Sequence, residues 1–309
     1  MSLQSVWEKI LSKSNLFFCR TVKINFKHFI VYEKKIYLYS ILGGFFLLFV
    51  IFSFSDLLTT PLLRISFYDV GQGDSIFIQT PARVQVLIDG GRDATILEKL
   101  AKDMPSYDRS IDLVIATHPN ADHISGLVDV LERYHVTNLF LPRVKNHTLA
   151  YQKLLSEAQK EGVTVNETWG IQDIILDKGI DFKILNPLRS EEYKNDNDFG
   201  IVGLLTYNKF QALFTADISK EKEEKIMKFL PRNIAVLKVA HHGSRYSSSF
   251  NFLNYIHPQI SIIQVGKNNY GHPAQETLDK IESIGSLMLR TDRNGDIKVS
   301  SDGKTYWVE

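Results

Sequence analysis

The stretch Leu113-Val114-Ile115-Ala116-Thr117-His118-Pro119-Asn120-Ala121-Asp122-His123 decides how this chain folds. Its first four residues form a short apolar run, which predicts a buried strand. Two imidazoles and a carboxylate follow within six residues, and a turn at the end of a strand can aim several such groups at one point. The alternative is a polar turn in which Asp122 lies at the N-terminus of a helix. That alternative explains Asp122 and His123 poorly, because adjacent side chains cannot both face one core.

Three later segments repeat the pattern of an apolar strand followed at once by Asp or His. Five of the nine histidines therefore lie just past expected strand ends. Histidine, aspartate and water suit Zn²⁺ or Mn²⁺, and two such ions can share a bridging carboxylate. The sequence thus predicts a metal centre assembled from several strand ends. The later segments are 212–217, which ends at Asp217, 234–244, which contains His241 and His242, and 260–273, which contains His272.

Seven motifs follow one another between residues 64 and 309. They are DVGQGDS at 69–75, IDGG at 88–91, HPNADH at 118–123, FTAD at 214–217, KVAHHGS at 238–244, YGHP at 270–273 and RTD at 290–292. In this order they resemble the metallo-β-lactamase fold and, more narrowly, the extracytoplasmic hydrolase domain of the ComEC family of competence proteins. The resemblance implies an α/β architecture of the αββα type, with two β-sheets between two layers of helices. It also implies a metal-dependent hydrolase with two divalent ions (Zn²⁺ or Mn²⁺), acting on DNA or another phosphodiester and linked to DNA uptake.

The resemblance further implies which side chains hold the two ions, and the two expected sites differ. The tighter site would use Asp122, His123, Asp217 and one of His241 and His242. The looser site would use His118, Asp217 and either Asn120 or water. ComEC-like chains commonly carry Asp where this chain has Asn120, and a neutral amide ligates metal poorly. The ion of the looser site should therefore be easier to remove.

Further residues are expected to act in catalysis or to support the ligands. Two ions would lower the pKa of a shared water and stabilise charge on a phosphoryl oxygen. His272 is the candidate donor to that oxygen, or the general acid for the leaving oxygen, although an ordinary turn would also explain it. Catalytic roles are assigned to Asp122 and His272. Roles behind the ligands or against substrate are assigned to Asp74, Asp89, Asn197 and Ser244, with a loop contact or a helix cap as the alternative for Asp89 and Ser244.

A second informative region is the uncharged stretch of nineteen residues from 36 to 54. As a helix it would be roughly 28 Å long, close to the ~30 Å hydrocarbon core of a bilayer. Residues 1–35 hold seven basic and two acidic residues, an asymmetry that keeps the N-terminus in the cytoplasm. We therefore expect a cytoplasmic tail (1–35), a single transmembrane helix (36–55), a linker (56–63) and an extracytoplasmic hydrolase domain (64–309) at the cell membrane. A cleavable signal peptide is the alternative, but the apolar stretch exceeds the usual 7–15 residues.

The net charge of the expected outer domain bears on its substrate. Outside residues 1–55 the chain has 29 basic and 33 acidic residues, a formal charge of −4. That balance is poor for holding DNA through its phosphates, so DNA rests on the resemblance alone. The single cysteine, Cys19, lies on the expected cytoplasmic side, and the outer domain therefore contains no disulfide.

The same motifs are compatible with several functions. The same site would also suit another small phosphoester, a lactone or a β-lactam as substrate. A catalytically decayed centre would leave a surface binding protein, and Asn120 is the best support for that alternative. ComEC also has a multi-span channel region, so this chain would be a solitary hydrolase or one half of a split system with a separate channel protein. Membrane lipid is the other expected partner, through the apolar stretch.

The expected secondary structure begins with antiparallel strands joined by turns and continues with strands that alternate with helices. The apolar periodicity predicts strands at 64–68, 75–79 and 84–89 and helices at 124–134, 149–161, 219–229 and 274–284. Gly71 and Gly73 are expected to permit a tight turn that brings the backbone close to the metals.

Overall fold

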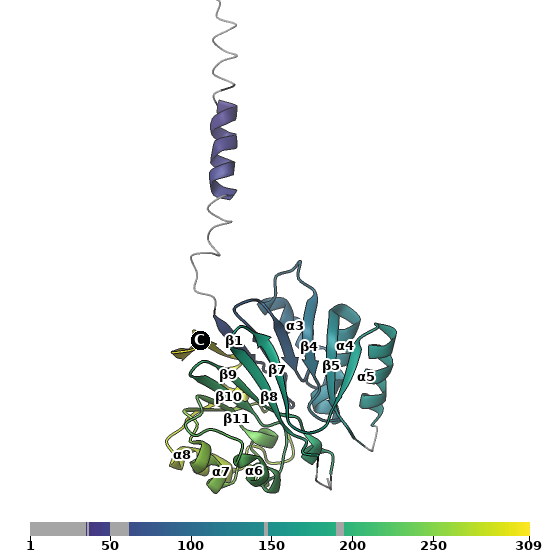
Figure 1. Cartoon of the computed structure of the whole chain (residues 1–309), viewed down its shortest axis with the longest axis vertical. Coiled ribbons are helices and arrows are strands. Elements are labelled where there is room, and N and C mark those ends of the chain that lie inside the picture. Colours follow the sequence, from purple (N-terminus) through teal and green to yellow (C-terminus); the bar gives the residue numbers. More distant parts are fainter. Residues whose placement is uncertain (1–34, 36, 50–61, 145–147, 190–194) are drawn as a thin grey trace, which may run out of the picture. The chain divides into compact units, whose positions relative to one another are not determined.

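A computed structural model describes residues 35, 37–49, 62–144, 148–189 and 195–309 of the 309-residue chain (Figure 1). The chain divides into two units, residues 1–60 and residues 61–309. The second unit contains every motif of the expected metal centre.

The described part of the first unit is helical. Residues 37–49 form a helix whose side chains are all exposed. Within the described ranges, none of the helices is both long enough and apolar enough to cross a bilayer. The expected transmembrane helix includes residues 36 and 50–55, which lie outside the described residues, as do residues 1–34 of the expected tail and 56–61 of the expected linker.

The first sheet of the second unit has eight strands in the order β15-β14-β1-β2-β3-β4-β5-β6. Its antiparallel half, β15 to β3, is followed by a parallel half, β3 to β6. Short loops join β1 to β2, β2 to β3 and β14 to β15, whereas a helix joins each pair of parallel strands, as parallel pairing requires. The strands are β1 (Leu63–Phe67), β2 (Ile76–Gln79), β3 (Gln85–Ile88), β4 (Ser110–Ile115), β5 (His135–Pro142), β6 (Thr164–Thr168), β14 (Ile297–Ser301) and β15 (Tyr306–Val308).

The second sheet has seven strands in the order β13-β12-β11-β10-β9-β8-β7. Strands β7 to β10 are antiparallel, and β10 to β13 are parallel. Each sheet therefore combines an antiparallel part with a part of parallel strands that helices connect. The strands are β7 (Gln172–Asp177), β8 (Ile180–Asn186), β9 (Val202–Tyr207), β10 (Phe210–Phe214), β11 (Val236–Lys238), β12 (Ile260–Ile263) and β13 (Leu287–Arg290).

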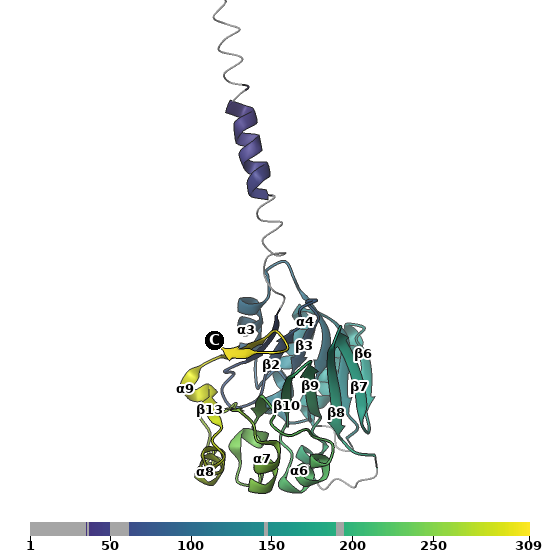
Figure 2. The same cartoon turned by 60° about the vertical axis from the view of Figure 1, so that its left-hand side comes forward.

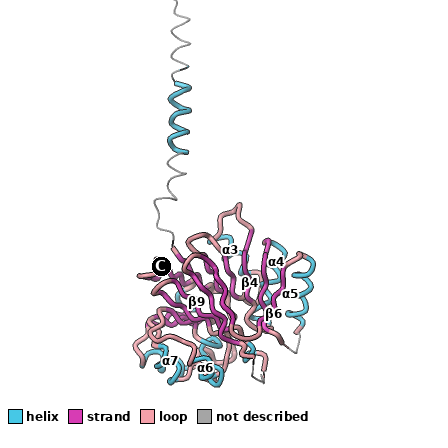
Figure 3. The backbone as a smooth tube through the Cα atoms, viewed as in Figure 1, coloured by secondary structure: helices cyan, strands magenta, loops and turns pink. Residues whose placement is uncertain are grey.

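Helices cover the outer face of each sheet, as Figures 2 and 3 show. Helices α3 to α5 connect strands of the first sheet, and α6 to α8 connect strands of the second. The helices are α3 (Thr95–Asp103), α4 (Ala121–Arg133), α5 (Leu149–Lys160), α6 (Lys220–Met227), α7 (Phe250–Ile256), α8 (Gln275–Ser283) and the short α9 (Thr291–Asn294), with 3-10 turns η1 (Asn197–Phe199) and η2 (Ala240–Gly243).

Three apolar layers hold the helices and sheets together. A central layer lies between the sheets, where the rings of Phe67 and Phe214 stack 6.2 Å apart. One outer layer lies under α3 to α5 and the other under α6 to α8. In β4, Leu113 and Ile115 face the central layer while Val114 faces the helices. A strand covered on both faces is apolar without alternation, which explains the apolar run that precedes HPNADH. The αββα sandwich is confirmed.

Helix α4 begins three residues earlier than the apolar periodicity predicts. The expected start was residue 124, but the helix starts at Ala121, after Asn120 in an extended conformation. The first turn is polar because it carries Asp122 and His123, so apolar periodicity could not detect it. Both motif residues are therefore fixed on a helix rather than on a loop.

Candidate metal centre

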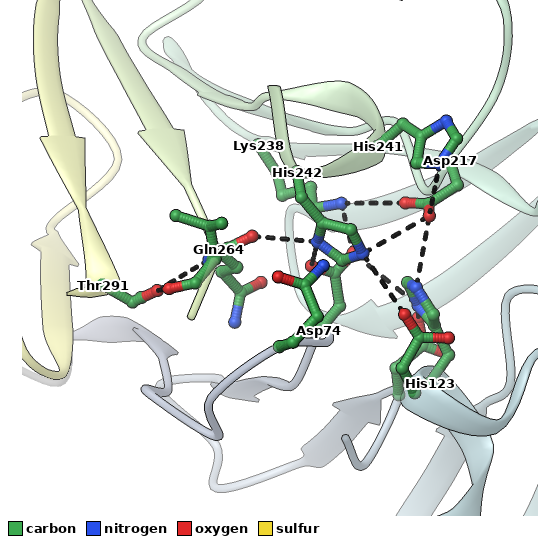
Figure 4. A network of polar contacts seen from close by, with 12 residues as sticks. Asp74, His123, Asp217, Lys238, His241, His242, Gln264 and Thr291 are labelled. Carbon is green, nitrogen blue, oxygen red and sulfur yellow. Dashed lines mark hydrogen bonds and ion pairs between the residues drawn. The ribbon is translucent and has the colours of Figure 1, made fainter. Parts of the chain in front are cut away.

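The expected ligands come from four places and meet between the two sheets (Figure 4). His118 follows β4, and Asp122 and His123 occupy the first turn of α4. The remaining ligands come from the second sheet, where Asp217 follows β10 and the pair His241 and His242 follows β11 within η2. Because β4 and β10–β11 belong to opposite sheets, the centre exists only once the sandwich has closed.

One carboxylate oxygen, Oδ2 of Asp217, lies at the middle of this group. The four histidine Nε2 atoms that surround it are those of His123 at 3.4 Å, His242 at 3.5 Å, His118 at 3.8 Å and His241 at 3.9 Å. A tetrahedral ion with ligand bonds of about 2.1 Å holds its ligand atoms about 3.4 Å apart. The separations around Asp217 are therefore those of a set of ligands around metal, and a carboxylate in this position can bridge two ions.

The ligand nitrogens have no other partner. The Nε2 atoms of His118, His123 and His242 are buried and make no hydrogen bond within the described part of the chain. Buried polar atoms normally find a partner, and a cluster of exceptions at one place needs an explanation. Three free imidazole nitrogens facing one carboxylate are suited to bind a divalent cation. The residues present therefore fit the metal that the motifs imply.

The tighter side of the centre is well defined. Nε2 of His242 lies 3.7 Å from Oδ2 of Asp122 and 3.5 Å from Asp217, and Asp122, His123 and His242 form a group in which each offers one ligand atom. Two imidazoles and two carboxylates can thus reach one ion. His242 is fully buried here, whereas the side chain of His241 is 29% exposed. The geometry assigns His242 rather than His241 to this side.

The side of the centre formed by His118 and His241 has fewer carboxylate ligands. His118 and His241 each approach Asp217, and the other carboxylate near His118 is that of Asp89, which is already hydrogen-bonded to Thr117 and His123. The amide of Asn120 donates from Nδ2 to Oδ1 of Asn197 at 2.8 Å, which links the HPNADH turn to η1. Asn197 therefore lies against Asn120, behind this side of the centre. The two sides differ in charge, with two carboxylates on one and only the shared carboxylate on the other.

Carboxylates behind the ligands orient the imidazoles. Oδ2 of Asp89 lies 2.8 Å from Nδ1 of His123, and the same carboxylate accepts hydrogen bonds from the backbone and hydroxyl of Thr117. Asp89 therefore both orients a ligand and fixes the loop. Nδ1 of His242 lies 2.9 Å from the carbonyl of Gln264 and 3.3 Å from Oδ1 of Asp74. In each case an Nδ1 proton is held by an acceptor, which leaves Nε2 free to ligate.

Lys238 is a component of the centre that sequence reasoning missed. Its side chain is 1% exposed, and its Nζ contacts Oδ2 of Asp74, the carbonyl of Ala216 at 3.1 Å and Oδ1 of Asp217 at 3.6 Å. Lys238 thus holds the oxygen of Asp217 that faces away from the imidazoles. The signal was present, because a lysine inside the apolar strand 234–239 is rarely buried without a partner.

The charges of the centre shift its protonation. Burial lowers the pKa of His242, but the carboxylates of Asp217 and Asp74 outweigh burial and raise it to about 9. The pKa of His123 is likewise raised by Asp217 and Asp89 against the effect of burial. Burial and the neighbouring His123 lower the pKa of His118 to about 3. Without metal, the centre therefore holds protons on the tighter side, and a cation must displace them.

His272 lies at the edge of the centre. Its ring is 5.3 Å from the ring of His241, and its Nδ1 is buried without a partner among the described residues. Burial and the imidazoles of His241 and His242 lower its pKa to about 4. A neutral imidazole at pH 7 suits a hydrogen-bonding role better than that of an imidazolium acid.

Ser244 does not reach the centre with its hydroxyl. The residue is fully buried, and its Oγ accepts a hydrogen bond from the backbone N–H of Tyr246 at 3.3 Å. The hydroxyl closes a local turn and is neither exposed to a substrate nor the cap of α7, whose N-cap is Ser249.

The turn that carries Asp74 requires a glycine for close approach. Gly73 has φ +138°, and a Cβ there would lie 2.0 Å from the carbonyl oxygen of Asp122. The backbone of the turn therefore packs directly on the first turn of α4. The expected approach of the DVGQGDS turn to the centre is confirmed.

A centre of imidazoles and carboxylates between two helix-covered sheets defines a metal-binding protein of the αββα class. The family model of the metallo-beta-lactamase superfamily matches residues 68–267, and the chain belongs to this superfamily. Its curated relatives include ComE operon protein 3 of Bacillus subtilis (strain 168), which is 31% identical over 76% of this chain and 32% of the relative. Competence protein ComA of Neisseria gonorrhoeae is 27% identical over 75% of this chain and 31% of the relative. The resemblance to ComEC-like competence proteins is thereby confirmed, although the chain spans only about a third of these relatives.

Solved structures share the fold at low identity. The metallo-beta-lactamase fold protein YhfI of Bacillus subtilis matches 80% of this chain and 100% of its own length with a TM-score of 0.53 and 10% identity. CmlA, a diiron β-hydroxylase of Streptomyces venezuelae, matches 79% of this chain and 54% of its own length with a TM-score of 0.53 and 13% identity. Because one of these proteins is a hydroxylase, the fold by itself does not decide the reaction.

Proposed function

We propose that this chain is a metal-dependent hydrolase of phosphodiesters, a nuclease in the setting of DNA uptake. The observation that carries the proposal is the arrangement around Asp217, where four imidazole nitrogens face one buried carboxylate oxygen. Superfamily membership supports hydrolysis, and the similarity to competence proteins supports a nucleic acid substrate.

The residues of the centre would have separate roles in metal binding, ligand orientation and substrate contact. Asp122, His123, His242 and Asp217 would hold one divalent ion, and Asp217, His118 and His241 the other. Such ions, when bound, supply Lewis acidity toward a phosphoryl oxygen and lower the pKa of water. Asp89 and Asp74 keep the ligand imidazoles oriented, and Lys238 keeps Asp217 turned toward them. His272, neutral at pH 7, would donate or accept a hydrogen bond at a substrate oxygen beside His241.

We also propose that the hydrolase is anchored in the membrane by residues 36–54, with the second unit outside the cytoplasm. The support is the exposure of every apolar side chain in the helical residues 37–49, together with the basic excess in residues 1–35. A separate channel protein is a further candidate partner, by similarity to the competence proteins, of which this chain matches about a third. Protease treatment of intact cells tests the orientation, and protection of the second unit would overturn it.

Metal content and hydrolysis test the activity. The purified full chain should bind more than one Zn²⁺ or Mn²⁺ per molecule and should cleave single-stranded DNA and bis-p-nitrophenyl phosphate. Asp122→Ala should remove hydrolysis, because it deletes a ligand of the tighter site. Asp129→Ala is the matched control, since it removes a carboxylate two turns further along α4. Equal rates for both variants would refute the assignment of the site, and less than one ion per chain would favour a binding protein.

A further inference from the structure

A pocket of about 370 Å³ lies beside the metal centre, and no carboxylate lines it. It is lined by Gln72, Arg92, Lys267, Asn268, Asn269 and Tyr270. The lining combines two cationic side chains, three amides and one aromatic ring. That combination differs from the rest of the second unit, in which acidic residues outnumber basic ones.

The pocket is joined to the metal centre by direct contacts. The ring of Tyr270 lies 6.0 Å from the ring of His272, which in turn lies 5.3 Å from the ring of the expected ligand His241. On its other side, Arg92 follows Gly91, whose N–H donates to the carbonyl of Asp74 at 2.9 Å. The pocket and the centre therefore share the same supporting segments.

Hydrogen bonds and close packing hold the loop that forms most of the pocket. The amide of Asn268 donates to the carbonyls of Gly266 and His272 and accepts from the backbone N–H groups of Tyr270 and His272, all at 2.8–3.1 Å. A Cβ at Gly266 would lie 2.4 Å from the backbone of Gly71, so the loop also packs closely on the DVGQGDS turn. Lys267, Tyr270 and His272 are thus presented by a preorganised loop, which lowers the entropic cost of binding a ligand.

The cationic groups of the pocket make no ion pair with the rest of the described fold, and its aromatic ring stacks on His272. Arg92 and Lys267 are exposed, and neither forms an ion pair within the described part of the chain. The side chain of Tyr270 is 70% exposed, and only its backbone makes hydrogen bonds within the described ranges. A single exposed arginine, lysine or tyrosine is common on a protein surface. Here they converge on one pocket at the mouth of a metal centre.

We propose that this pocket binds the nucleotide next to the scissile phosphodiester of a single-stranded nucleic acid. The face of Tyr270 stacks on the base, and Arg92 and Lys267 contact the adjacent phosphate. Aromatic stacking accepts any base, and guanidinium and ammonium groups pair well with phosphate oxygens. A base stacked within a duplex cannot meet the tyrosine face, which is why the occupant is a single strand. The inference rests on the proposed phosphodiesterase function and adds the residues that select a polynucleotide.

Substrate comparison with the full chain in detergent tests this subsite. The measurement is kcat/KM for a single-stranded oligonucleotide divided by kcat/KM for bis-p-nitrophenyl phosphate. The second substrate has a single phosphate, so it cannot occupy the metal centre and contact Arg92 and Lys267 with an adjacent phosphate at the same time. Tyr270→Ala should lower this ratio about 5- to 150-fold, the range expected for loss of one stacked base, and Tyr270→Phe should retain it. Tyr107→Ala, which removes an 82% exposed tyrosine elsewhere, is the control and should not change the ratio. An unchanged ratio in Tyr270→Ala, or an equal fall for both substrates, would overturn the subsite.

A binding measurement separates this proposal from the hydrolase proposal. Fluorescence anisotropy of a labelled single-stranded oligonucleotide with the metal-free full chain needs no cleavage. Weaker binding by Arg92→Gln/Lys267→Gln, with a shallower dependence of affinity on salt, would support the subsite even if no substrate were hydrolysed. Wild-type affinity and salt dependence in that double variant would refute the subsite whether or not the enzyme is active.

Discussion

Replacing Lys238 with Met should strongly destabilise the metal-free protein. Lys238 is 1% exposed, and its Nζ contacts the buried carboxylates of Asp74 and Asp217. Burial lowers the pKa of Lys238, but the two carboxylates outweigh burial and raise it, so the side chain is a cation at neutral pH. Removing one partner of a buried ion pair leaves uncompensated charge and costs about 3–5 kcal/mol. The free energy of unfolding of Lys238→Met should fall by that amount.

Urea unfolding of the chelator-treated full chain, followed by tryptophan fluorescence, measures this loss. Lys160→Met is the matched control, because the Lys160 side chain is 63% exposed and pairs with Glu157 on the surface of α5. Exposed ion pairs contribute little to stability, so the control should unfold nearly as the wild type does. Combining Lys238→Met with Asp74→Asn should recover part of the loss, because the second change removes one of the charges left unpaired.

Added metal should narrow the difference between Lys238→Met and the wild type. Divalent cations bound at Asp217 supply positive charge where the ammonium group is missing, and a ligand that binds only the folded state stabilises it. If Lys238→Met unfolded like Lys160→Met without metal, Lys238 would not support the centre, and the role given to it here would be wrong.

Three further predictions concern the ligands, the DVGQGDS turn and pH. Asp89→Asn should weaken metal binding about 10- to 100-fold in a competition titration, because it loosens His123; unchanged affinity would contradict this. Gly73→Ala should reduce metal binding and stability, whereas Gly71→Ala, whose Cβ meets nothing within 4 Å, should cost only about 1 kcal/mol of backbone strain; equal losses would refute the packing argument. The pKa of His242, about 9, lies above its usual 6.5, so the metal-free fold should lose stability as pH rises from about 6.5 through 9. Over the same range metal affinity should rise by up to about tenfold per pH unit for each proton displaced, and a flat affinity in calorimetric titrations would count against this.

Many of the strands and helices could be predicted from local sequence patterns. The apolar run before HPNADH predicted β4, and the expected helices 149–161 and 274–284 agree with α5 and α8 to within a residue at each end. These elements were predictable because burial imposes a period on apolar residues. The start of α4 was not, since its first turn carries ligands in place of apolar residues.

The centre was only partly predictable for a different reason. Sequence identified the imidazoles and carboxylates but left His241 and His242 equivalent. Consecutive left-handed backbone conformations, with φ of 50° at His241 and 51° at His242, send the two rings to different sides of Asp217. Residues in that region are held there by their surroundings, which a local pattern does not record.

The sequence by itself determined the order of the motifs and the residue types around the metals, because spacing and chemistry are local properties of the chain. The αββα class followed from the family resemblance that these motifs carry. Tertiary structure alone decided that Lys238 pairs with both Asp74 and Asp217, and that Tyr270 and Arg92, 178 positions apart in sequence, line one pocket. Both depend on distances between segments that become neighbours only when the two sheets close on each other.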